Sequence, residues 1–214
     1  MRPPATFTAS LRLATRLRTV PNYSTLHRPR QYSINGLKEK VIGRQFATSA
    51  VAPGHVETIS PGAELPSSVT VKEDAADKPA PFNFPDGRHI IVGVPGAFTG
   101  TCHAQIPGYI SRFEEFKSKG IEQIAVVAVN DVFVLKAWKE NLAPQGTPVR
   151  FIADDAGAFA TALGLAFDAS PLLGNVRAKR FVIVANGKTV ETIAVEEIPS
   201  QLTVTDAKTI IAQL

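Results

Sequence analysis

The chain has 214 residues, 44% of them hydrophobic and 20% charged, which is typical of a globular protein with one domain of ordinary size and an appendage. No apolar run approaches the roughly 18–20 residues that a membrane span needs, so no membrane partner is expected. The formal charge of +4 comes from the first 50 residues, with nine Lys/Arg and one acid; the rest holds 14 Lys/Arg and 18 acids, which argues against a nucleic-acid partner.

The N-terminal segment, residues 1–46, has the composition of a mitochondrial transit peptide: it is rich in arginine and hydroxyl residues and nearly free of acids. Leu11, Leu13 and Leu17 lie among arginines and predict an amphipathic helix with a cationic face. Arg44-Gln-Phe46, followed by Ala47, resembles a matrix-processing site. We therefore expect removal of residues 1–46 and a location in the mitochondrial matrix; the alternative is a disordered basic tail.

Residues 47–214 predict one α/β domain, which begins with an N-terminal arm over residues 47–86. Within the arm, Ser68–Val71 alternates as one strand of a short hairpin does. His89–Val94 is a buried strand that ends at Pro95-Gly96. Thr101–Gly120 predicts a helix, because apolar residues recur along it three and four positions apart and Gly120 is a plausible stop.

The second half of the domain continues the alternation of strands and helices. The predicted strands are residues 124–129, 149–153, 180–185 and 189–195, and the last two flank an Asn-Gly turn that indicates a hairpin. Asn130-Asp131 and Asp154-Asp155 are expected to cap helices, the second running through Leu163, and Asp206 begins the final helix. This order predicts a thioredoxin-like fold, with a central mixed sheet flanked by helices.

Cys102 is the single cysteine of the sequence, which excludes an intramolecular disulfide, a Cys-x-x-Cys pair and a multi-cysteine metal site. Such a residue is either an inert part of the core or a reactive thiol. Cys102 follows a strand and lies in the first turn of a helix, where unpaired N–H groups favour a thiolate. A helix end contributes only about 0.3–1 kcal/mol, so a reactive thiolate at neutral pH also needs a cation nearby.

Pro95 and Thr99 precede the cysteine in the pattern Pro-x-x-x-Thr-x-x-Cys. Pro95 ends the strand and can shield the thiol from water, and the Thr99 hydroxyl is expected beside the sulfur. This pattern is a strong signal when it lies in a strand-to-helix turn. No partner at metal-ligand spacing accompanies the histidines, so we expect no metal and no other cofactor.

The segment from Val94 to Cys102, with the sequence VPGAFTGTC, together with Ile106–Tyr109, resembles the peroxidatic loop of the type II (atypical, peroxiredoxin-5-like) peroxiredoxins. Residues 129–134, 153–159 and 174–181 resemble the same branch. The resemblance covers about 125 residues, from about Ile90 to the C-terminus.

The resemblance implies a thiol-dependent peroxidase that reduces hydrogen peroxide and organic hydroperoxides through a sulfenic acid on Cys102. Thr99 and Pro95 would complete the loop motif, and Arg180 would be the catalytic arginine that stabilises the thiolate, with Arg177 as the fallback. The alternative for Arg180 is a solvated strand edge. A homodimer is also expected from the resemblance.

The sequence departs from the family in two respects. It has no second, resolving cysteine, so an external thiol must reduce Cys102, either glutathione with glutaredoxin or thioredoxin. His103 directly follows the cysteine and Pro107 comes five residues after it, one fewer than in most members, which puts the local helix geometry in doubt. Two other functions remain open: a peroxide sensor that passes oxidation to a partner, and a Cys-His hydrolase, for which His103 is poorly placed.

Overall fold

The computed structural model describes residues 56–214, and the predicted transit peptide lies outside them. No helix in this part of the chain is long and apolar enough to cross a membrane. The helices and strands, in chain order, are β1 (Thr70–Val71), β2 (Ala80–Pro81), β3 (Arg88–Val94), α1 (Gly100–Ser111), α2 (Phe113–Ser118), β4 (Gln123–Ala128), α3 (Val132–Leu142), β5 (Arg150–Ala153), α4 (Ala158–Ala162), β6 (Ala166–Asp168), α5 (Ser170–Leu173), β7 (Val176–Ala178), β8 (Phe181–Asn186), β9 (Thr189–Val195) and α6 (Ala207–Gln213).

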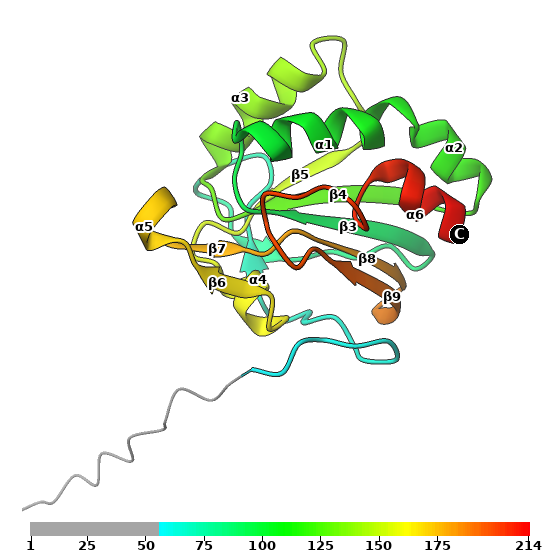
Figure 1. Ribbon diagram of the computed structural model, residues 1–214, viewed down its shortest axis with the longest axis horizontal. Helices are drawn as coiled ribbons and strands as arrows, with labels where there is room; N and C mark the ends of the chain where they lie inside the picture. Colours follow the sequence, from blue (N-terminus) through cyan, green and yellow to red (C-terminus); the bar gives the residue numbers. More distant parts are fainter. Residues whose placement is uncertain (1–55) are drawn as a thin grey trace, which may run out of the picture. The chain divides into compact units, whose positions relative to one another are not determined.

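A five-stranded mixed sheet in the order β5-β4-β3-β8-β9 forms the centre of the domain (Figure 1). Strands β3, β4 and β5 are parallel, whereas β8 pairs antiparallel with β3 and β9 antiparallel with β8. The predicted thioredoxin-like α/β fold, with its mixed sheet and C-terminal hairpin, is therefore confirmed. In the N-terminal arm, β1 and β2 form the expected short hairpin.

Helices cover the sheet on both faces, and the side chains of each central strand divide between two cores. Ile90, Val92 and Val94 of β3 pack on the face covered by α1, α2, α3 and α6, whereas Ile91 packs on the face that holds α4. This alternation follows from the two-residue period of a strand. Because both faces are covered, β3 and β4 read as continuous apolar runs in the sequence.

The predicted single helix over Thr101–Gly120 is wrong in one respect: the structure has two helices, α1 and α2. At Arg112 the backbone leaves the helical region, with φ −106° and ψ 16°. The apolar stripe continues across the break, with Tyr109 before it and Phe116 after it stacked at 5.5 Å, so periodicity alone could not reveal it. Pro107 is accommodated inside α1.

Two further features differ from the prediction. Helix α4 begins later than expected, after Gly157 in the left-handed region (φ 68°), and it ends at Ala162. Asp154 still serves its N-terminus, because its carboxylate accepts hydrogen bonds from the N–H groups of Phe159 and Ala160, both at 2.9 Å. The small β6-β7 pair and α5, between residues 166 and 178, were not predicted, since each is only three or four residues long.

Candidate active site

Cys102 is the third residue of α1, directly beyond the carboxyl end of the central strand β3. Its side chain is completely buried, and its thiol is free. The first N–H of this region to pair within the helix is that of His103, which donates to the Thr99 carbonyl at 2.8 Å. The preceding N–H groups, including that of Cys102, belong to the helix N-terminus, which favours an anion.

The loop from Pro95 to Thr99 carries the chain from β3 into α1, and two hydrogen bonds hold it in a shape that places one residue in a left-handed conformation. The Ala97 N–H donates to the side-chain oxygen of Asn130 at 2.9 Å. Phe98 has a φ of 61°, a left-handed conformation that costs a non-glycine residue roughly 1–2 kcal/mol. The Thr99 hydroxyl donates to the Gly96 carbonyl at 3.0 Å, so it must rotate before it can donate to a bound peroxide.

Arg180 supplies the cation that a thiolate at Cys102 would need. It lies immediately before β8, and its side chain is 1% exposed. Its Nη2 lies 3.3 Å from Sγ of Cys102, within hydrogen-bond distance of sulfur. A guanidinium stays protonated in proteins, so this contact places a permanent positive charge beside the buried thiol.

Two further groups, the Pro199 carbonyl and the Gln105 side chain, accept hydrogen bonds from Arg180 and fix its guanidinium. Nε and Nη2 both donate to the Pro199 carbonyl, at 3.0 and 2.7 Å, and Nη1 donates to Oε1 of Gln105 at 2.6 Å. Because Gln105 lies three residues after Cys102 on α1, the same helix carries both the thiol and a side chain that orients the arginine.

Arg177, the fallback cation of the sequence reasoning, has other partners. Its guanidinium donates to backbone carbonyls of Val129 at 2.9 Å, Leu173 at 3.1 Å and Pro95 at 3.5 Å, and to the Asn175 side chain. It therefore ties α5 and the end of β4 to the loop that precedes Cys102. Arg180, and not Arg177, makes the hydrogen bond to the sulfur.

The His103 side chain is not placed to act as a base for the thiol. Its Nδ1 accepts a hydrogen bond from the indole N–H of Trp138 at 3.1 Å, and its ring stacks near Phe98, with centroids 6.5 Å apart. With Nδ1 engaged as an acceptor, the neutral ring carries its proton on Nε2. This arrangement gives no support to a Cys-His hydrolase.

A cavity of about 430 Å³ opens beside the buried thiol, and most of its wall is apolar. Arg180, whose Nη2 contacts Sγ of Cys102, lines this cavity together with Thr99 and Pro95. The other lining residues come from α1, the β6–α5 segment and the loop after β9: Gly100, Thr101, Phe167, Asp168, Ala169, Pro171, Leu172, Leu173, Pro199 and Ser200.

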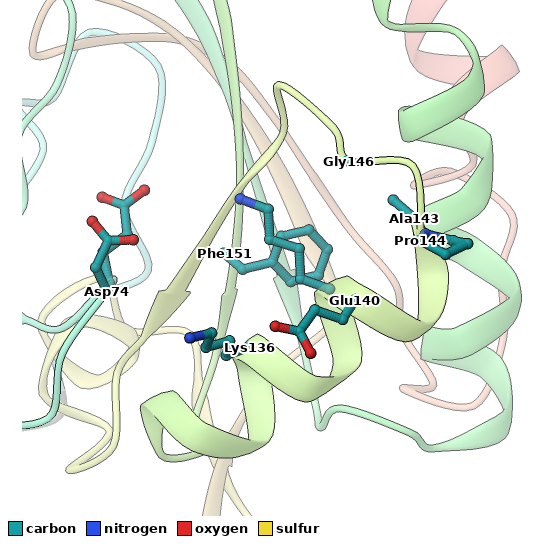
Figure 2. A pocket seen from close by; sticks show the side chains of 9 residues that line it. Asp74, Lys136, Glu140, Ala143, Pro144, Gly146 and Phe151 are labelled. Atoms are coloured by element: carbon teal, nitrogen blue, oxygen red, sulfur yellow. The ribbon is translucent and has the colours of Figure 1, made fainter.

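A second cavity of about 410 Å³ lies between α3 and β5, away from the thiol. Figure 2 shows Lys136 and Glu140 projecting from α3 on one side and Asp74 on the other. Neither a cysteine nor a histidine lines this cavity, so it offers no nucleophile for thiol chemistry.

Four of the buried polar residues form one hydrogen-bonded network that ends on Cys102: Arg180, Gln105, Thr205 and Glu196. Sequence reasoning predicted Arg180 and missed the other three. A signal for Gln105 was present, since it falls on the buried face of α1 with Ile106, where a polar residue needs a buried partner. No local signal identifies Thr205 or Glu196, because their roles depend on contacts formed by the fold.

Burial and hydrogen bonding shift the pKa of Glu196, and burial shifts that of Tyr109, which hydrogen-bonds to Thr205 of the network. At Glu196, desolvation raises the pKa, but donors from Thr203 and Thr205 outweigh it and hold the pKa at about 2. At Tyr109, whose hydroxyl donates to the Thr205 carbonyl at 2.6 Å, burial raises the pKa far above its ordinary value. Glu196 is thus a carboxylate and Tyr109 a neutral phenol throughout the physiological range.

Comparisons with family models and with known proteins agree on one family. A family model described as Redoxin matches residues 60–211. The chain is 46% identical over 142 residues to the peroxisomal membrane associated protein 20 of Schizosaccharomyces pombe, covering 65% of this chain and 90% of that protein. It is 34% identical over 186 residues to the mitochondrial peroxiredoxin-2F of Arabidopsis thaliana, covering 84% of this chain and 91% of that protein.

Solved structures agree with the sequence relatives. The reduced Prx3 of Vibrio vulnificus, in complex with hydrogen peroxide, is similar with a TM-score of 0.65 at 34% identity. The match covers 73% of this chain and 100% of that chain.

Proposed function

Because the chain belongs to the redoxin family and is a type II peroxiredoxin, an enzyme that reduces peroxides with thiols, we propose that Cys102 is its peroxidatic nucleophile. The observation that carries this proposal is the 3.3 Å contact between Nη2 of Arg180 and the buried Sγ of Cys102. A guanidinium at this distance stabilises a thiolate, and the thiolate is the reactive form of cysteine.

In the proposed reaction the Cys102 thiolate attacks one oxygen of the peroxide in line with the O–O bond. The S–O bond forms as the O–O bond breaks, and the leaving oxygen takes a proton to become water or an alcohol. Cys102 is left as a sulfenic acid. Arg180, backbone N–H groups at the start of α1 and the Thr99 hydroxyl, once rotated, stabilise the negative charge on the oxygens. Pro95 limits the access of water.

The mechanism we propose uses one cysteine, since the sequence offers no resolving cysteine. An external thiol attacks the sulfenic acid, releasing water and forming a mixed disulfide, and a second thiol then releases the reduced Cys102. Glutathione with glutaredoxin, or thioredoxin, would supply these thiols. The apolar wall of the cavity beside the site, with Phe167, Leu172 and Leu173, favours organic hydroperoxides as well as hydrogen peroxide.

We further propose a homodimer that covers exposed apolar side chains near this end of the domain. Phe98 in the active-site loop is 51% exposed, Phe133 at the start of α3 is 71% exposed, and Leu172 on α5 is 87% exposed. Exposed apolar residues of this size around one site are typical of an interface. Sedimentation of the wild-type chain as a monomer at micromolar concentration would contradict this assembly.

For localisation we propose the mitochondrial matrix, on the composition of residues 1–46. One relative is named mitochondrial and another peroxisomal, so the family alone allows either. Import of the full chain into isolated mitochondria, followed by sequencing of its new N-terminus, tests this proposal. A new N-terminus near Ala47 is expected, and retention of Met1 would contradict it.

The two candidate functions, peroxidase and peroxide sensor, differ in the turnover that they predict. We expect wild-type protein to consume peroxide continuously when supplied with glutathione and glutaredoxin or with thioredoxin and its reductase, and the Cys102→Ser variant to consume none. A single fast oxidation without turnover, whichever donor is supplied, would favour the sensor instead.

A further inference from the structure

Several side chains hydrogen-bond to the loop between β9 and α6, residues 197–206, and Glu196 makes the largest number of these bonds. Glu196 accepts four hydrogen bonds from it: from the N–H and hydroxyl of Thr203, at 2.7 and 2.6 Å, and from the N–H and hydroxyl of Thr205, at 2.9 and 2.8 Å. One backbone hydrogen bond, from Gln201 to Ile198, closes a turn within the loop. The hydroxyls of Thr101 and Thr209 add one bond each, to the carbonyls of Ser200 and Thr203, both at 3.1 Å. The carboxylate of Glu196 is therefore the principal anchor of the second half of the loop.

The same loop presents its carbonyl groups to the active site. The Pro199 carbonyl receives two hydrogen bonds from Arg180, and the Thr205 carbonyl receives those of Gln105 and Tyr109, at 3.0 and 2.6 Å. Gln105 in turn accepts from Arg180. Both supports of the Arg180 guanidinium, the Pro199 carbonyl and the Gln105 amide, thus depend on where this loop lies.

We propose that Glu196 is a positioning residue for the peroxidatic site: its carboxylate anchors the loop over residues 197–206 at Thr203 and Thr205, and the loop aims the Arg180 guanidinium at Cys102. This inference rests on the function proposed above and assigns that site an additional residue. Glu196 touches neither Cys102 nor the cavity, so its effect is exerted through Thr203, Thr205 and the carbonyl of Pro199.

Two features make this coupling tight. Glu196 and Arg180 are also joined through the backbone, since the Glu196 N–H donates to the Arg180 carbonyl at 3.0 Å. Both side chains are almost completely buried, so a donor that loses its partner is not compensated by bulk water. Removing the carboxylate leaves the buried donors of Thr205 unpaired, and the loop must move to satisfy them. A shift of about 1 Å in a positioned group is enough to slow a reaction about 100-fold.

The test compares four variants by two readouts, measured well below the lowest melting temperature of the set. Glu196→Ala removes the carboxylate. Glu196→Gln keeps an oxygen acceptor and an isosteric shape. Thr203→Val removes one donor from an exposed residue, and Glu197→Gln, on the exposed neighbour, is the matched control. The readouts are the second-order rate constant for peroxide reduction and the pH at which the alkylation of Cys102 by iodoacetamide reaches half its maximal rate.

We expect Glu196→Ala to lower the rate constant by about 10- to 100-fold and to move the alkylation midpoint to higher pH. Glu196→Gln should recover most of the rate, Thr203→Val should lose about 2- to 5-fold, and Glu197→Gln should match wild type. A merely structural role would lower the melting temperature and leave the alkylation midpoint unchanged.

Folded Glu196→Ala with a rate within twofold of wild type and an unshifted midpoint would overturn the proposal. If Glu196→Ala does not fold, a wild-type rate and midpoint for Thr203→Val would overturn it equally. Cys102→Ser, measured alongside, distinguishes a failure of the Glu196 proposal from a failure of the proposed function. If Cys102→Ser retains activity, the proposed function itself is wrong.

Discussion

Arg180 and Cys102 are separated by 78 positions in the chain, yet Nη2 of the arginine lies 3.3 Å from Sγ of the cysteine. The antiparallel pairing of β3 with β8 brings them together, because it sets Phe181 opposite Gly93. Arg180 then lies beside the end of β3, where the chain turns through Pro95 into α1. The register of the sheet therefore creates the contact between Arg180 and Cys102. Substitutions at either residue can test it.

Replacing Arg180 is expected to slow peroxide reduction strongly. Arg180→Met should reduce the second-order rate constant by about 100- to 1000-fold, as for the loss of one electrostatic donor in a buried site. Arg180→Lys should recover little, since an ammonium cannot reproduce the planar fork that bonds Pro199 and Gln105. Stopped-flow kinetics measure the effect, with the exposed Lys188→Gln as a control for the loss of one positive charge.

Acid should destabilise the protein through Glu196, whose pKa is held at about 2, below that of a glutamate in the unfolded chain. A lowered folded-state pKa adds stability that is complete above about pH 5 and is lost as the pH falls towards 2. The shift corresponds to about 3 kcal/mol. Urea unfolding between pH 5 and 2.5 should show this slope in wild type and a shallower one in Glu196→Gln, and equal slopes would contradict the assignment.

A separate loss of stability is expected at milder acidity from His89. Desolvation by burial lowers its pKa, partly opposed by a hydrogen bond to the Gly87 carbonyl, and its Nε2 has no partner within the described residues. Because the folded-state pKa is lowered, its stabilisation is present above about pH 6.5 and falls below that value. His89→Phe, which preserves stacking on Phe84, should flatten the unfolding free energy between pH 6.5 and 5; an unchanged profile would show that His89 does not titrate there.

Gly93 in β3 should not tolerate a side chain. A Cβ at this position would lie 2.1 Å from the ring of Phe181, which is fully buried on the opposing strand. Gly93→Ala is therefore expected to lower the free energy of unfolding by about 3 kcal/mol and, by moving Phe181, to disturb its neighbour Arg180. Gly100→Ala, where a Cβ meets nothing within 4 Å, is the matched control and should be neutral in denaturant unfolding.

The sequence predicts the features of the fold and of the site that local patterns encode. Strand β3 and helix α3 with its Asp131 cap follow from apolar runs and capping residues, and the family motif places Cys102 and Arg180 in one site. The break at Arg112 was invisible because the apolar stripe passes through it. Glu196 gives no local signal, since four donors from a loop without regular structure converge on it only after folding.

If Cys102 reduces one peroxide and can react again only after an external thiol has reduced it, a stoichiometric titration should show a single turnover. Reduced wild-type protein is mixed with excess peroxide in the absence of any thiol, and the peroxide consumed and the sulfenic acid formed are measured in the first turnover. We predict one equivalent consumed per chain, one sulfenic acid on Cys102, and no reaction of Cys102→Ser. Consumption of many equivalents without a thiol, beyond the few that over-oxidation of one cysteine can use, or any consumption by Cys102→Ser, would contradict a one-cysteine peroxidase.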